Sequence, residues 1–141
     1  MYKITDHFNL EEFYESDTAK SNFIDNYPTQ EAMSNIRKLV LEVLEPIRVK
    51  YALPITVTSG YRSKRLNDKL HGAINSDHLY GCAADIKADK MLLLWTTINK
   101  MSNNNLISCR QIIDEYHLKW IHISINNSHN SNKHNQILHI H

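Results

Sequence analysis

The spacing of hydrophobic and polar positions predicts an alternation of helices and short strands. A long helix is predicted after Pro28, because Thr29 can cap its start and apolar residues recur at helical spacing as far as Ile47. Pro46 lies inside this pattern and predicts a kink, or an end of the helix near Glu45. A second apolar stripe predicts another helix over residues 89–101.

The polar stretches predict shorter elements. Asn9 can cap a first turn over residues 9–14, and residues 16–28 read as a loop that ends at a proline. Ser63 can cap a short helix that extends to Leu70, and a second loop is expected over residues 71–77.

Four apolar or alternating segments are typical of strands, and a fifth lies near the end of the chain. Residues 109–115 and 119–125 are separated by few residues, which predicts a hairpin, and residues 136–141 alternate as an edge strand does. The remaining two strands are expected at 55–58 and 83–86. We therefore predict an α+β fold, with a small antiparallel sheet and helices packed on one side of it.

Length and composition narrow the class of protein. The chain has 141 residues, 42% of them hydrophobic and 22% charged, which predicts one globular domain over residues 1–141 and excludes a disordered chain. The formal net charge of +1 argues against a nucleic-acid partner. We expect a monomer.

Targeting signals are not evident in the sequence. The longest apolar run, Met91–Trp95, is too short to span a membrane, and the first residues contain no apolar segment typical of a secretory signal. Cys82 and Cys109 form no motif of paired cysteines. We expect synthesis in the cytoplasm with no signal peptide, so that any action outside the cell would follow release.

Three residues offer metal-binding chemistry. His78, Asp85 and His122 supply two imidazoles and one carboxylate, which suit Zn²⁺ with its fourth position left open. Gly81 lies between the first two, where a residue free to adopt unusual backbone angles lets the loop turn so that both side chains converge.

A carboxylate is expected beside this group. If Glu115 pairs with Trp120 across the predicted hairpin, it becomes the diagonal neighbour of His122 on the same face of the sheet. A register shifted by one residue would place Asp114 there instead. Either carboxylate could take a proton from water and return it to a leaving amine, so both remain candidates for the general base.

Three ordered motifs resemble the zinc D-Ala-D-Ala carboxypeptidase family, which is grouped with lysostaphin and hedgehog. They are Ser-Gly-Tyr-Arg-Ser at 59–63, Ser-x-His-x-x-Gly-x-Ala-x-Asp at 76–85 and Trp-x-His-x-Ser at 120–124. The similarity covers most of the chain and is greatest to small single-domain forms from phages and bacteria. It implies a hedgehog/D-Ala-D-Ala peptidase-like fold, a Zn²⁺ cofactor and hydrolysis of peptidoglycan stem peptides or cross-links, by a carboxypeptidase or by an endopeptidase of the endolysin type.

The resemblance also implies roles for individual residues. It assigns the zinc ligands to His78, Asp85 and His122, the general base to Glu115, and contact with the peptide or carboxylate of the substrate to Arg62. It places Tyr61 and Ser76 along the substrate site. This sequence departs from the family at Lys119, where many relatives have the catalytic acid.

Lys119 also supports a second hypothesis, a catalytically silent zinc module that binds the cell wall or a protein. Cys82 could be a thiolate ligand, although a small buried residue explains it better. The histidines at 129, 134, 139 and 141 lie within or beside a polar loop, and we do not expect them to form a second metal site.

Overall fold

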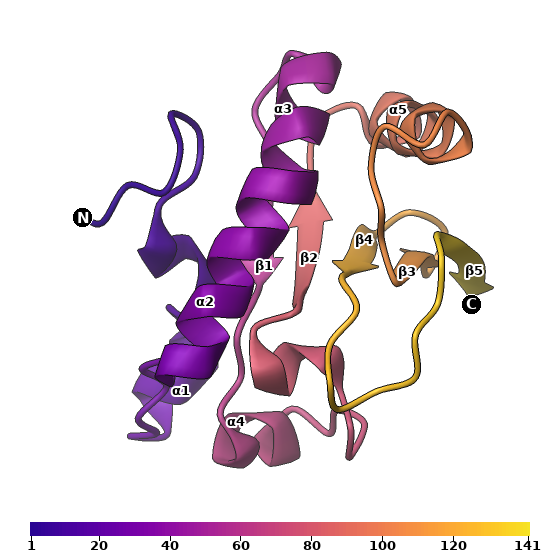
Figure 1. Cartoon of the computed structure of the whole chain (residues 1–141). Helices are drawn as coiled ribbons and strands as arrows, with labels where there is room; N and C mark the ends of the chain where they lie inside the picture. The colour runs from indigo at the N-terminus through magenta and orange to yellow at the C-terminus, as the bar shows by residue number, and fades with distance from the viewer.

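Five strands form one sheet in the computed structural model, which describes residues 1–141 (Figure 1). The strand order is β1-β2-β4-β3-β5. The bounds are β1 Thr56–Ser59, β2 Ala83–Lys87, β3 Gln111–Glu115, β4 Trp120–Ser124 and β5 Gln136–Ile140.

The sheet is mixed rather than wholly antiparallel. The β1–β2, β2–β4 and β4–β3 pairs are antiparallel as predicted, whereas β5 pairs in parallel with β3. Both sides of β4 are already occupied, by β2 and β3, so β5 cannot pair with the strand before it and joins at the free side of β3. It reaches that side through residues 125–135, a connection long enough for a parallel pairing. The expected edge position of this strand is confirmed.

The helical segments agree with the predicted pattern in most places. α2 and α3 follow one another as one continuous helix, and α4 and α5 lie close to their expected positions (Figure 1). The bounds are α1 Asp17–Ser21, α2 Gln30–Leu39, α3 Glu45–Tyr51, α4 Lys64–Lys69 and α5 Met91–Asn103, with 3-10 turns η1 Leu10–Phe13 and η3 Asp77–Tyr80.

Pro46 does not end the long helix. A π-helical segment, η2 (Val40–Leu44), precedes it, and the Glu45 N–H donates to the carbonyl of Val40 five residues earlier. Proline offers no N–H and its ring crowds the carbonyl four residues back, so a wider turn at this point accommodates it. The helix then continues to Tyr51.

The segment expected to be a loop before Pro28 contains a short helix. The Ser16 hydroxyl accepts a hydrogen bond from the Ala19 N–H and so caps α1, and Asp17 occupies its first turn. At five residues, α1 is too short for apolar periodicity to indicate it.

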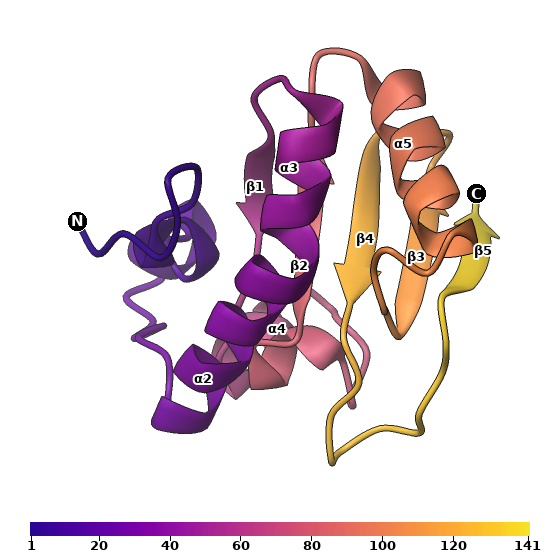
Figure 2. The ribbon, with the colours of Figure 1, turned by 45° about the horizontal axis from the view of Figure 1, so that its top comes forward.

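The core lies between the sheet and the helices that cover one of its faces. Figure 2 shows the α2–η2–α3 helix and α5 on the same side of the sheet. Ile36 and Leu94 from these helices belong to the same buried cluster as Ile86, Ile121 and Ile123 from the strands. The opposite face of the sheet carries polar side chains together with Ile113 and Trp120. None of the helices has the length and apolar character needed to cross a membrane.

Candidate metal centre

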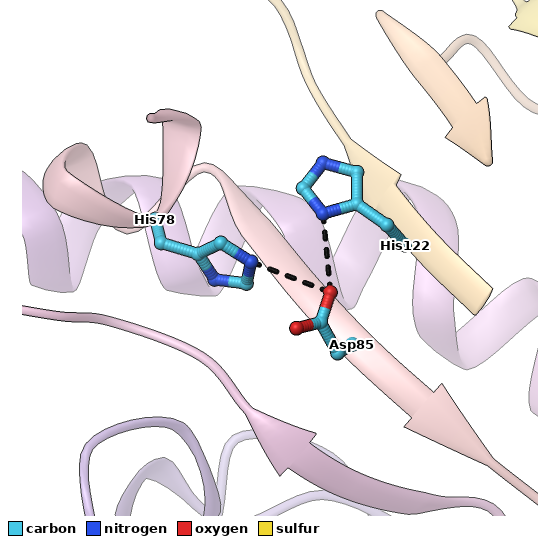
Figure 3. A group of neighbouring side chains, drawn as sticks. All are labelled: His78, Asp85 and His122. Carbon is cyan, nitrogen blue, oxygen red and sulfur yellow. Dashed lines mark hydrogen bonds and ion pairs between the residues drawn. The ribbon is translucent and has the colours of Figure 1, made fainter. Parts of the chain in front are cut away.

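His78, Asp85 and His122 converge in the folded chain (Figure 3). They come from η3, β2 and β4, and one potential ligand atom from each lies within 4.8 Å of the others. Asp85 and His122 are direct partners in the β2–β4 register. No other group of three such side chains meets this criterion in the structure.

The alternation of the strands places two of these side chains. Ala84 and Ile86 point into the core, so Asp85 between them faces the opposite side of the sheet. In the same way, Ile121 and Ile123 are fully buried and His122 faces away from the core. The apolar content of two neighbouring strands therefore puts the carboxylate and the imidazole on one face.

The third side chain is placed by a glycine turn. Gly81 ends η3 with a φ of +73°, in the left-handed region that favours glycine. A Cβ at this position would also run into the carbonyl oxygen of Ala32. The turn between His78 and Asp85 therefore depends on glycine both for its backbone angle and for its close approach to α2.

The hydrogen bonds of His78 identify which ring nitrogen is free. Nδ1 lies 2.7 Å from the carbonyl oxygen of Gly60, which can only accept, so Nδ1 carries the proton. In the neutral ring, Nε2 then presents a lone pair 3.3 Å from Oδ1 of Asp85. Two acceptors that face each other require a cation, either a proton or a metal ion. The donor set thus fits a metal such as zinc, and the Gly60 contact is the kind of outer hydrogen bond that orients a ligating histidine.

Burial controls the protonation of this centre. Burial lowers the pKa of His78 and outweighs the opposing effect of Asp85, which favours the neutral ring that a metal requires. Burial alone would raise the pKa of Asp85, but the charges and hydrogen bonds of His78 and His122 hold it below its ordinary value. The carboxylate is therefore ionised at neutral pH.

Arg62 flanks the centre and is held on all sides. Its Nη2 lies 3.5 Å from Oδ2 of Asp85, its Nε donates to the Ser59 hydroxyl and its Nη1 donates to the side-chain oxygen of Asn67. Burial lowers its pKa, whereas the charges of Asp85 and Glu115 oppose that shift. The guanidinium is thus fixed beside the carboxylate of the metal site.

The hairpin register brings Glu115 to the same cavity. Glu115 pairs with Trp120, as in the first of the two registers considered, and its Oε2 accepts a hydrogen bond from the Trp120 indole N–H. A cavity of about 350 Å³ is lined by Glu115, Arg62 and all three candidate ligands. Asp114 does not line it, and binds the Leu118 N–H and His139 instead.

A comparison with known protein families agrees with this arrangement. The profile described as Peptidase M15 matches residues 6–124, which include every candidate site residue. The chain belongs to the peptidase M15 family. Peptidases of this family are zinc-dependent, and the convergent group at residues 78, 85 and 122 could bind such a metal. A search of curated proteins found no match.

The two residues predicted to line the substrate site of this M15 chain, Ser76 and Tyr61, lie at different depths. Ser76 lines the cavity of the metal centre, and its hydroxyl accepts a hydrogen bond from the His78 N–H, so it fixes the start of η3. Tyr61 packs into the core and lines only a neighbouring cavity. Cys82 is fully buried in the same core and is absent from the ligand group.

The sequence reasoning missed a polar network behind η3. Asp77 is buried, and its carboxylate accepts hydrogen bonds from Arg110 at 2.7 Å, Asn127 at 2.9 Å and Asn130 at 2.7 Å. Arg110 also donates to the carbonyl of Ser131. Asp77, the residue before His78, thereby attaches η3 to the residue that precedes β3 and to the connection before β5. Its partners are 33 to 53 residues away, and no local pattern could have indicated them.

Proposed function

We propose that this M15 peptidase is a zinc-dependent hydrolase that cleaves a peptide bond in the stem peptides or cross-links of peptidoglycan. One observation carries the proposal. A single cavity is lined by three candidate metal ligands, a carboxylate and a guanidinium, which is the chemistry that metal-assisted peptide hydrolysis needs. The family resemblance supplies the substrate class.

Each residue has a role that its position supports. His78, Asp85 and His122 would hold zinc, which supplies a Lewis acid and lowers the pKa of water to about 7. Glu115 accepts the proton of the attacking water and passes it to the amine as the C–N bond breaks. The Arg62 guanidinium, fixed beside Asp85, stabilises negative charge on the carbonyl oxygen. Ser76 and Tyr61 border the path of the peptide.

Such a substrate lies outside the cytoplasmic membrane. We propose that the protein is made in the cytoplasm and acts as a monomer on the cell wall after release, as in lysis by a phage.

The experiment combines cell-wall digestion with metal analysis. Purified protein loaded with zinc is incubated with sacculi of several wall chemotypes, and new amino groups are counted with and without a chelator. We expect chelator-sensitive release. A protein that holds zinc and releases nothing from any of these walls would instead be the silent binding module.

The neighbouring acids provide a matched pair of variants. Glu115→Gln should lower turnover by roughly 10²–10⁴-fold, the usual contribution of a general base, while the zinc content stays the same. Asp114→Asn changes the adjacent carboxylate, which lies outside the cavity, and should retain most of the turnover. Equal losses in the two variants would refute the assignment of Glu115.

A further inference from the structure

A second, larger cavity adjoins the metal centre. Its volume is about 760 Å³, and it shares three lining residues, Arg62, Asp85 and Trp120, with the smaller cavity. It extends along β1, the edge strand of the sheet, between that strand and the segment around α1. The open space beside the candidate ligands therefore consists of the smaller cavity and, past Asp85, the larger one.

The smaller cavity offers no free cation for a chain terminus. An exopeptidase that removes a C-terminal residue must hold a carboxylate at one end of its site, and an unpaired arginine or lysine is the usual group for that. Of the two arginines that line this cavity, Arg110 is paired with the buried Asp77, and Arg62 is held against Asp85 at the reacting centre, where the proposed mechanism uses it for the carbonyl oxygen. Neither is left to hold a terminal carboxylate. No lysine lines the cavity.

The larger cavity does not supply that group either. Lys20 and Lys87 line it, but both are exposed and their charges are offset by carboxylates on the same walls. Three acidic residues, Glu12, Glu15 and Asp17, line the same cavity, so it presents no excess of positive charge to a terminal carboxylate.

We infer that the substrate is a peptide that continues on both sides of the cleaved bond, and that the enzyme is an endopeptidase rather than a carboxypeptidase. This inference rests on the proposed function. One part of the peptide occupies the smaller cavity beside the metal ligands, and the other lies extended along β1. Hydrolysis adds the hydroxyl of water to the carbonyl carbon and a proton to the amine, so it yields two peptides and no free terminal amino acid.

The test uses two purified muropeptides, a cross-linked dimer and a monomer that ends in D-Ala-D-Ala, with products identified by mass spectrometry. We expect cleavage of internal bonds with no free alanine, and less than a twofold change in rate when the terminal carboxylate is amidated. Free alanine from the monomer with intact dimers would overturn the inference and leave the proposed function standing. No cleavage of either muropeptide by the zinc-loaded protein would overturn both.

A variant in the larger cavity tests its use directly. Thr56 is an exposed residue of β1 that lines only this cavity, so Thr56→Trp fills the space at a position where a strand tolerates an aromatic side chain. We expect at least a tenfold loss in kcat/KM for the dimer. Thr96→Trp, at an exposed position of α5 outside both cavities, is the control and should not change it. An unchanged kcat/KM in Thr56→Trp would show that the peptide does not lie along β1.

Discussion

Asp77 provides the sharpest test of how the metal centre is supported. Replacing it with asparagine keeps the shape of the side chain and removes its charge, which leaves the Arg110 guanidinium paired with no carboxylate. Removing one partner of a buried ion pair costs about 3–5 kcal/mol. Only 4% of the Asp77 side chain and 12% of the Arg110 side chain are exposed, so the pair belongs to this buried class.

The surroundings reduce this cost. Arg110 retains its hydrogen bonds to Ser131 and Gln111, and the amide oxygen of an asparagine can still accept from Asn127 and Asn130. We therefore expect Asp77→Asn to lower the free energy of unfolding by about 3 kcal/mol, near the lower end of that range. For a chain of this size the loss corresponds to a fall of roughly 10 °C in Tm.

Urea denaturation with an unchanged m-value would measure this loss. Asp68→Asn is the matched control, because Asp68 pairs with Lys64 on α4 at 3.1 Å but both side chains are largely exposed. Such a pair contributes at most about 1 kcal/mol. A double-mutant cycle of Asp77→Asn with Arg110→Met should give a coupling of at least about 1 kcal/mol. A loss in Asp77→Asn no larger than in Asp68→Asn would refute this reasoning.

Three further predictions concern the same region. Gly81→Ala should destabilise the fold by about 1–3 kcal/mol, because the turn is left-handed and the new Cβ meets Ala32; unchanged stability in urea would contradict this. Burial raises the pKa of both Cys82 and Cys109 to about 12. A thiol reagent at pH 8 should therefore label neither cysteine in the native protein and both after denaturation. Fast labelling of the native protein would be inconsistent with the structure. Because burial lowers the pKa of His78, protons compete for its Nε2 only below the ordinary histidine pKa of about 6.5. Between pH 8 and pH 7, protonation of His78 should therefore not lower the affinity for zinc, which chelator competition measures. A tenfold loss of zinc affinity over this range that is present in the wild type and absent in His78→Ala would argue against a neutral ring.

The sequence alone predicts the placement of a side chain where a short-range rule, such as strand alternation, determines it. Alternation along β4 requires Ile121 and Ile123 to face the core, and this alone turns His122 to the other side. The sequence left two hairpin registers open, and the structure has the first of them, with Glu115 paired with Trp120 and so placed diagonally to His122.

Features that depend on distant partners could not be predicted in this way. The pairing of β5 depends on which edge of the sheet remains free, and a strand pattern carries no information about that. The hydrogen bonds of Asp77 join three segments, η3, the residue before β3 and the connection between β4 and β5, and asparagines such as Asn127 and Asn130 are common in loops without any such role. The π turn before Pro46 shows the same limit, because the helix continues only where packing on both sides of the proline stabilises it.

The parallel pairing of β5 also changes which strand is exposed at this edge of the sheet. Without this strand, β3 would be an outer strand with a row of unpaired N–H and C=O groups, which is a template for association between copies. β5 covers that row and is itself only five residues long, a length that limits further strand addition. The matched family segment ends at Ser124, before β5 begins. Residues 136–140 therefore cover the outer strand of the family-matched segment, a task separate from the chemistry on the open face of the sheet.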